Sequence, residues 1–73
     1  MKFYRIWNII EKNQDGSSKY NGFAEVEAQS PEDAVRIAGD ENWEIGVPIE
    51  GFEVERIKDL SGDGAVIEYC GEF

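Results

Sequence analysis

Aromatic and β-branched residues gather in four separate runs along the chain, which predicts four β-strands. The runs cover residues 3–10, 20–28, 52–60 and 65–70. Short runs of this composition are typical of strands. In the second run, small apolar side chains alternate with larger or charged ones, as expected of a strand that buries one face. We expect this buried face to leave room for a helix.

Turn sequences separate the runs within each half of the chain. Residues 13–18 contain Asp15-Gly16, and residues 61–64 read Ser-Gly-Asp-Gly. Glycine adopts the positive backbone angles that tight hairpin turns require. Each pair of runs is therefore predicted to form a β-hairpin.

A helix is predicted between the two hairpins. It begins at Ser30, a residue suited to the N-cap, which is followed by a proline and two acidic residues in the first turn. Ala34, Ile37 and Ala38 then lie on one face at helical spacing. Gly39 is expected to end the helix or to mark a bend in it.

These elements predict an α+β fold, in which one helix covers one face of an antiparallel sheet of about four strands in ββαββ order. With 73 residues the chain is about half the usual domain length, so residues 1–73 are predicted to form a single small domain. Residues 43–51 contain two glycines and a proline and are predicted to be a loop. This loop would tuck apolar side chains against the core, namely those of Trp43, Ile45, Val47 and Ile49.

The first run is apolar on both sides, so its pattern leaves open which side the helix covers. Either Phe3, Trp7 and Ile9 or the set of Tyr4, Ile6 and Ile10 must face away from the helix. One sheet face could therefore be exposed and apolar, which would suit dimerisation or partner binding.

The composition argues against several classes of protein. The chain has no histidine and no glycine-rich phosphate loop, so we predict no enzymatic activity, no catalytic residues and no cofactor. Cys70 is the single cysteine, which fits a reducing, cytoplasmic location and a buried structural thiol. No secretory signal or membrane-spanning run is visible, and we expect a soluble protein without a membrane partner.

Residues 59–64 resemble the first half of a calcium-binding loop, because oxygen-bearing side chains alternate before a glycine. The twelfth position would be Cys70, where such loops require a carboxylate. A hairpin turn is therefore the preferred interpretation, and no metal site is predicted. Weak divalent-ion binding by Asp59 and Asp63 stays open.

Negative charge is concentrated in the second half of the chain. The net charge is −9, and residues 37–73 contain ten acidic but only two basic side chains. Crowded carboxylates repel one another and oppose folding, so a small domain that retains them could use them. The predicted partner-binding residues are the six acids of the segment 37–55, namely Asp40, Glu41, Glu44, Glu50, Glu53 and Glu55.

An array of carboxylates favours a basic protein surface as the partner and disfavours direct binding to nucleic acid. One form of this hypothesis is charge mimicry, in which the carboxylates occupy the Lys and Arg residues that otherwise hold DNA phosphates. In size, acidity and lack of catalytic motifs the chain resembles small phage-encoded inhibitors of restriction and CRISPR systems. This resemblance implies an anti-CRISPR or anti-restriction type of inhibitor. The competing interpretation is that the acids only keep the protein soluble.

The alternative function is a small regulatory or assembly domain that forms a homodimer through an apolar sheet face. Residues 23–35 resemble the strand-to-helix passage of small antitoxins with a half double-stranded-RNA-binding fold. This resemblance implies a fold that contains a βαβ unit. Exposed rings on a sheet could also stack on bases, with nearby Lys and Arg guiding the strand.

Overall fold

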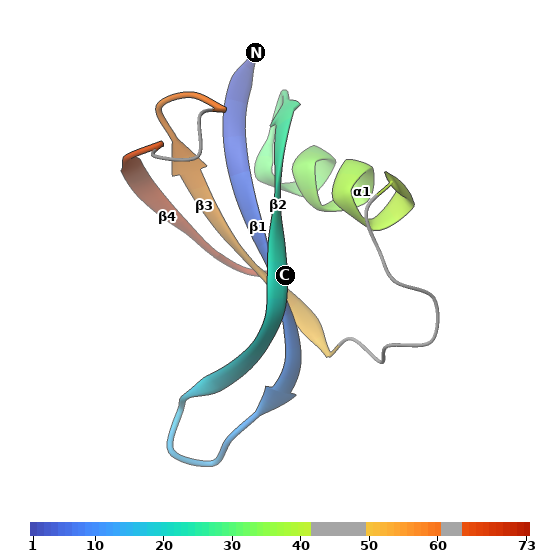
Figure 1. Ribbon diagram of the computed structural model, residues 1–73, viewed down its shortest axis with the longest axis vertical. Coiled ribbons are helices and arrows are strands. Elements are labelled where there is room, and N and C mark those ends of the chain that lie inside the picture. Colours follow the sequence, from blue (N-terminus) through green and yellow to red (C-terminus); the bar gives the residue numbers. More distant parts are fainter. Residues whose placement is uncertain (42–49, 61–63) are drawn as a thin grey trace.

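The computed structural model describes residues 1–41, 50–60 and 64–73, except for the side chains of Asp40 and Glu41. This part of the chain holds four strands and one helix (Figure 1). Their bounds in chain order are β1 (Lys2–Lys12), β2 (Ser18–Ala28), α1 (Pro31–Glu41), β3 (Gly51–Ile57) and β4 (Val66–Glu72). The strands form one antiparallel sheet in the order β2-β1-β3-β4. The predicted α+β fold with ββαββ order is confirmed.

The β1–β2 hairpin closes with the predicted Asp-Gly turn. Gly16 has a φ of +91°, and its N–H donates to the carbonyl of Asn13 at 3.2 Å. The Asp15 carboxylate accepts hydrogen bonds from the hydroxyl and the backbone N–H of Ser17, which lower the pKa of Asp15. Both strands continue beyond the end of β3, so this hairpin projects from the rest of the sheet (Figure 1).

Helix α1 begins where the sequence predicts. The Ser30 side-chain oxygen accepts a hydrogen bond from the backbone N–H of Asp33 at 3.1 Å, and the Ser30 carbonyl accepts from Ala34 at 3.0 Å. This is the N-cap arrangement, which satisfies backbone donors in the first turn. The helix continues past Gly39 and ends at Glu41, so Gly39 is not its last residue. A glycine within a helix is tolerated at a modest energetic cost.

The helix packs mainly against β2 and also contacts β1 and β3. Tyr4 and Ile6 of β1 are buried beneath it, which settles the question that the sequence left open: Phe3 and Trp7 face the other side. The predicted small residues of β2 do make room for the helix. The core cluster consists of Tyr4, Ile6, Val26, Ala28, Ala34, Ala38 and Val54.

A β-bulge in β2 changes the direction of its side chains. One residue of β1, Asn8, stands opposite two residues of β2, Asn21 and Gly22, and Gly22 has a φ of +95°. A glycine with positive φ at an extra residue is a recognised bulge type. Because the bulge resets the alternation, Tyr20 returns to the same face as Phe23, although three positions separate them.

A second bulge lies in β4. Val54 pairs with Gly71 and the next β3 residue pairs with Tyr69, so Cys70 is the extra residue. Gly71 has a φ of +110°. Tyr69 and Glu72 therefore lie on the same sheet face even though strict alternation would separate them.

Several sequence predictions fall on residues outside the described ranges. They include the apolar residues of the predicted loop from 43 to 49 and Asp63 in the second turn.

The bounds of the last two strands differ from the predicted ones. The third strand ends at Ile57, earlier than predicted, and the fourth extends to Glu72. Within the described ranges, no helix has the length and apolar character needed to cross a bilayer.

Candidate functional site

The face of the sheet opposite α1, which we call the outer face, carries carboxylates, aromatic rings and one arginine. Residues that stand opposite one another in neighbouring antiparallel strands share a face. Two such rows cross all the strands, from β4 through β3 and β1 to β2. The first row is Glu72, Glu53, Trp7 and Phe23, and the second is Tyr69, Glu55, Arg5 and Glu25.

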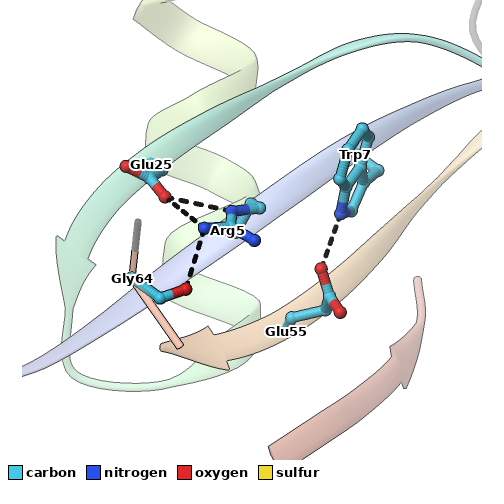
Figure 2. A network of polar contacts seen from close by, with 5 residues as sticks. All are labelled: Arg5, Trp7, Glu25, Glu55 and Gly64. Carbon is cyan, nitrogen blue, oxygen red and sulfur yellow. Dashed lines mark hydrogen bonds and ion pairs between the residues drawn. The ribbon is translucent and has the colours of Figure 1, made fainter. Parts of the chain in front are cut away.

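Arg5 lies in one half of this face and binds through two of its three guanidinium nitrogens. Its Nε and Nη2 atoms each lie 3.0 Å from Oε2 of Glu25, and Nη2 also donates to the carbonyl of Gly64 at 3.0 Å (Figure 2). The guanidinium carbon lies 5.3 Å from the ring centroid of Phe23. The Arg5 and Glu25 side chains are each only 14% exposed. This half of the outer face therefore holds an arginine between a carboxylate and a ring.

The other half of the outer face contains two carboxylates held by neutral donors. The indole Nε1 of Trp7 donates to Glu55 at 2.6 Å, as Figure 2 shows, and the hydroxyl of Tyr20 donates to Glu53 at 2.6 Å. Each donor fixes the position of a carboxylate without neutralising its charge. Among the described residues, Glu53 and Glu55 form no ion pair.

Aromatic rings surround these carboxylates. The Trp7 ring lies 5.5 Å from that of Tyr20 and 4.8 Å from that of Phe23, in tilted arrangements. Such spacings are favourable for aromatic pairs. Tyr20, Phe23 and Tyr69 are nevertheless 39%, 51% and 54% exposed, so the rings remain accessible to a partner.

The surroundings of Tyr20 and Tyr69 raise the pKa of both phenols. The hydrogen bond to Glu53 raises the pKa of Tyr20 to about 12. The pKa of Tyr69 is raised first by desolvation and then by the charge of Glu53. Both shifts favour the neutral phenol, which can donate a hydrogen bond to a carboxylate.

Like charges also meet across the last two strands. Glu53 stands directly opposite Glu72, an arrangement that is destabilising in a sheet. Lys12 Nζ lies 3.5 Å from a carboxylate oxygen of Glu72 and partly offsets this repulsion. The Lys12 and Glu72 side chains are 47% and 43% exposed, so solvent weakens their attraction.

The structure brings together two of the six predicted partner-binding acids. Glu53 and Glu55 lie on the outer face, whereas Glu50 precedes β3 and accepts a hydrogen bond from the backbone N–H of Lys12 at 3.1 Å. Asp40 and Glu41 belong to the last turn of α1, which packs on the opposite face of the sheet. Their side chains, and all of Glu44, lie outside the described part of the chain.

The partners of Glu53 and Glu55 were not identified from the sequence. Strict alternation places Tyr20 on the face opposite to Phe23 and Tyr69 on the face opposite to Glu72, and only the bulges unite them. The available signal was the isolated Gly22 within the second strand pattern, because such a glycine often marks a bulge. Gly71 follows the predicted fourth run and gave no such signal.

The described residues contain no cavity and no group of acidic or cysteine side chains arranged to hold a metal ion. Asp59 lies beyond the end of β3, and its suggested companion Asp63 is outside the described ranges, so weak ion binding is not tested. Cys70 is half-buried against the core, and desolvation raises the pKa of its thiol. At neutral pH this side chain is therefore a protonated, packed thiol.

No protein-family model, curated protein sequence or solved structure matches the chain significantly.

Proposed function

We propose that the protein is a non-catalytic binding module that covers the basic surface of a nucleic-acid-binding protein with its outer face. The observation that carries this proposal is the pair Glu53 and Glu55, two carboxylates that are fixed by hydrogen bonds and form no ion pair in the described part of the chain. A basic surface would supply the missing positive charge.

Position and rigidity both favour this role. The carboxylates project from β3 near the middle of the sheet, and Trp7 and Tyr20 hold them in place, so less side-chain entropy is lost when a partner binds. Carboxylates that accept hydrogen bonds from Arg or Lys compete directly with phosphates for the same donors. The protein would thus block a nucleic-acid site by charge mimicry, in the manner of an anti-restriction or anti-CRISPR inhibitor.

The first test is an affinity capture from a lysate of the source cells, eluted with rising salt, followed by a competition assay. The captured partner is mixed with labelled duplex DNA and increasing amounts of the protein. We expect a basic nucleic-acid-binding partner, elution at moderate salt and displacement of the DNA. A partner that keeps its DNA in the presence of excess protein contradicts the mimicry proposal.

A charge-matched pair of variants locates the surface. Glu53→Gln with Glu55→Gln removes two charges and keeps an oxygen that can accept the Tyr20 and Trp7 hydrogen bonds. Glu11→Gln with Glu32→Gln removes the same charge at exposed positions elsewhere. We expect at least a roughly tenfold loss of partner affinity in the first variant only, which corresponds to about 1.4 kcal/mol. Equal losses in both variants would show that net charge alone matters.

The exposed rings of Tyr20, Phe23 and Tyr69 favour a second candidate function, assembly of a homodimer through the outer face. Two copies joined in this way would bring their carboxylates together. Salt would therefore leave such a dimer unchanged or strengthen it, whereas salt weakens binding to a basic partner. Sedimentation measured at low and high salt separates the two candidates.

A further inference from the structure

One cation of the chain itself, Arg5, lies on the outer face and shows how this surface binds a positive charge. Arg5 lies between the carboxylate of Glu25, at 3.0 Å, and the ring of Phe23, at 5.3 Å. A guanidinium group suits this setting because its planar donors match a carboxylate and its face stacks on a ring. The surface thus combines the two elements that recognise arginine.

The neighbouring half of the same face repeats these elements, but its two central carboxylates, Glu53 and Glu55, form no ion pair with a cation of the described chain, and Lys12 pairs only with Glu72 at the edge. Glu53 and Glu55 supply carboxylates, and Tyr20, Trp7 and Tyr69 supply rings. Each carboxylate has about four acceptor positions, so the bond from Trp7 to Glu55 and those from Tyr20 and Tyr69 to Glu53 leave part of this capacity unused. Glu72, opposite Glu53, adds negative charge at the edge of this half.

We infer that this half of the outer face binds an arginine side chain of the partner protein, with the guanidinium between Glu53 and the Tyr69 ring. The inference rests on the proposed function and specifies its chemistry. Charge complementarity requires a cation, and the exposed ring favours arginine over lysine, since a lysine ammonium is more strongly hydrated and lacks a planar face. A second copy of this chain is a poor occupant, because both surfaces carry the same negative charge.

The test compares oligoarginine and oligolysine peptides of equal length by NMR titration of the isotopically labelled protein. The indole N–H signal of Trp7 is the reporter, because this group donates to Glu55 within the site. Its signal is distinguished from that of Trp43 with a Trp43→Phe variant. We expect the arginine peptide to bind roughly tenfold more tightly than the lysine peptide, in line with a partly desolvated cation–π contact.

Two variants and one control decide whether the preference comes from this site. Tyr69→Leu retains an apolar side chain at a position that is 54% exposed, and Glu53→Gln retains the acceptor for Tyr20. Both should abolish the preference for arginine, whereas Glu11→Gln should retain it. Circular dichroism confirms that each variant is folded.

The possible outcomes separate this inference from the proposed function. Equal affinity for the two peptides, or a preference that survives in Tyr69→Leu, overturns the arginine site but leaves binding of a basic partner intact. If neither peptide shifts the Trp7 signal at low salt, both the arginine site and the proposed function are wrong.

Discussion

The ion pair between Arg5 and Glu25 offers the sharpest test of how the outer face is held together. Arg5→Met keeps most of the aliphatic stem and removes the charge and all the donors. The Glu25 carboxylate and the Gly64 carbonyl each accept a hydrogen bond from Arg5 at 3.0 Å, and the change removes both bonds. It also removes the contact between the guanidinium and the Phe23 ring.

The expected magnitude follows from the burial of the pair. Removing one partner of a fully buried ion pair costs about 3–5 kcal/mol. The Arg5 and Glu25 side chains are each 14% exposed, so water reaches them slightly and we expect the lower end, about 3 kcal/mol. A domain of 73 residues has a total stability of about 4–11 kcal/mol, so the variant should still fold, with a narrow margin.

A double-mutant cycle isolates the interaction itself. Glu25→Gln keeps an oxygen that can accept from Arg5, and it should cost about 1–1.5 kcal/mol because a hydrogen bond to a charged group becomes weaker. In the double variant no charge is left unpaired, and we expect the free energy of unfolding to fall by only about 2 kcal/mol in total. The two positions should therefore show a coupling energy of about 2 kcal/mol.

The assay is urea unfolding monitored by circular dichroism. Tryptophan fluorescence is less suitable, because Trp7 lies on the same surface as the substitution. With a slope of about 1 kcal/mol per molar urea for so small a protein, Arg5→Met should lower the midpoint by roughly 3 M. The matched control is Arg36→Met, which breaks the Arg36–Asp33 pair, whose side chains are 63% and 37% exposed. Its loss should stay below about 0.5 kcal/mol. Equal midpoint shifts for the two variants, or additive single losses at positions 5 and 25, would refute this reasoning.

Two further predictions concern single side chains. Tyr20 should ionise near pH 12, and since this folded-state pKa is raised above the usual 10.0, its contribution to stability is complete below pH 10 and is lost as pH rises toward 12. Glu53→Gln should move the tyrosinate absorbance titration to lower pH, and identical curves would contradict the assigned hydrogen bond. Asn8 is 6% exposed, and its Oδ1 has no hydrogen-bond partner in the described structure, so Asn8→Leu should raise the free energy of unfolding by about 1 kcal/mol. A loss of stability on urea unfolding of this variant would show that the amide is satisfied after all.

Local signals in the sequence were sufficient for the order of elements. The start of α1 could be predicted because Ser30 and Pro31 satisfy the backbone requirements of a helix N-terminus by themselves. The Asp15-Gly16 turn was equally local, since Gly16 supplies the positive φ. Such features depend on residues adjacent in the chain and need no knowledge of the fold.

The face covered by the helix and the composition of the outer face could not be predicted in this way. Both sides of β1 are apolar, so the alternation in that strand gives no preference between Tyr4 and Trp7. The charge of Glu53 and Glu55 is visible in the sequence, but their positions depend on donors more than thirty positions away in the chain, Tyr20 and Trp7. Two bulges, each with a positive-φ glycine, shift the alternation and bring Tyr20 and Glu72 to this face.

The energetics of the outer face support the proposal that its partner is basic. Arg5 shows that a buried carboxylate on this surface is accommodated when a guanidinium lies against it. Glu53 has instead a neutral donor on one side and the like charge of Glu72 across the strand, which Lys12 offsets only in part. Burial of the surface by an apolar partner would increase the remaining electrostatic cost. On the proposed function, a partner that covers this face would bring positive charge with it. On the proposed function, the same repulsion that weakens the free domain would disfavour neutral and acidic partners and select basic ones.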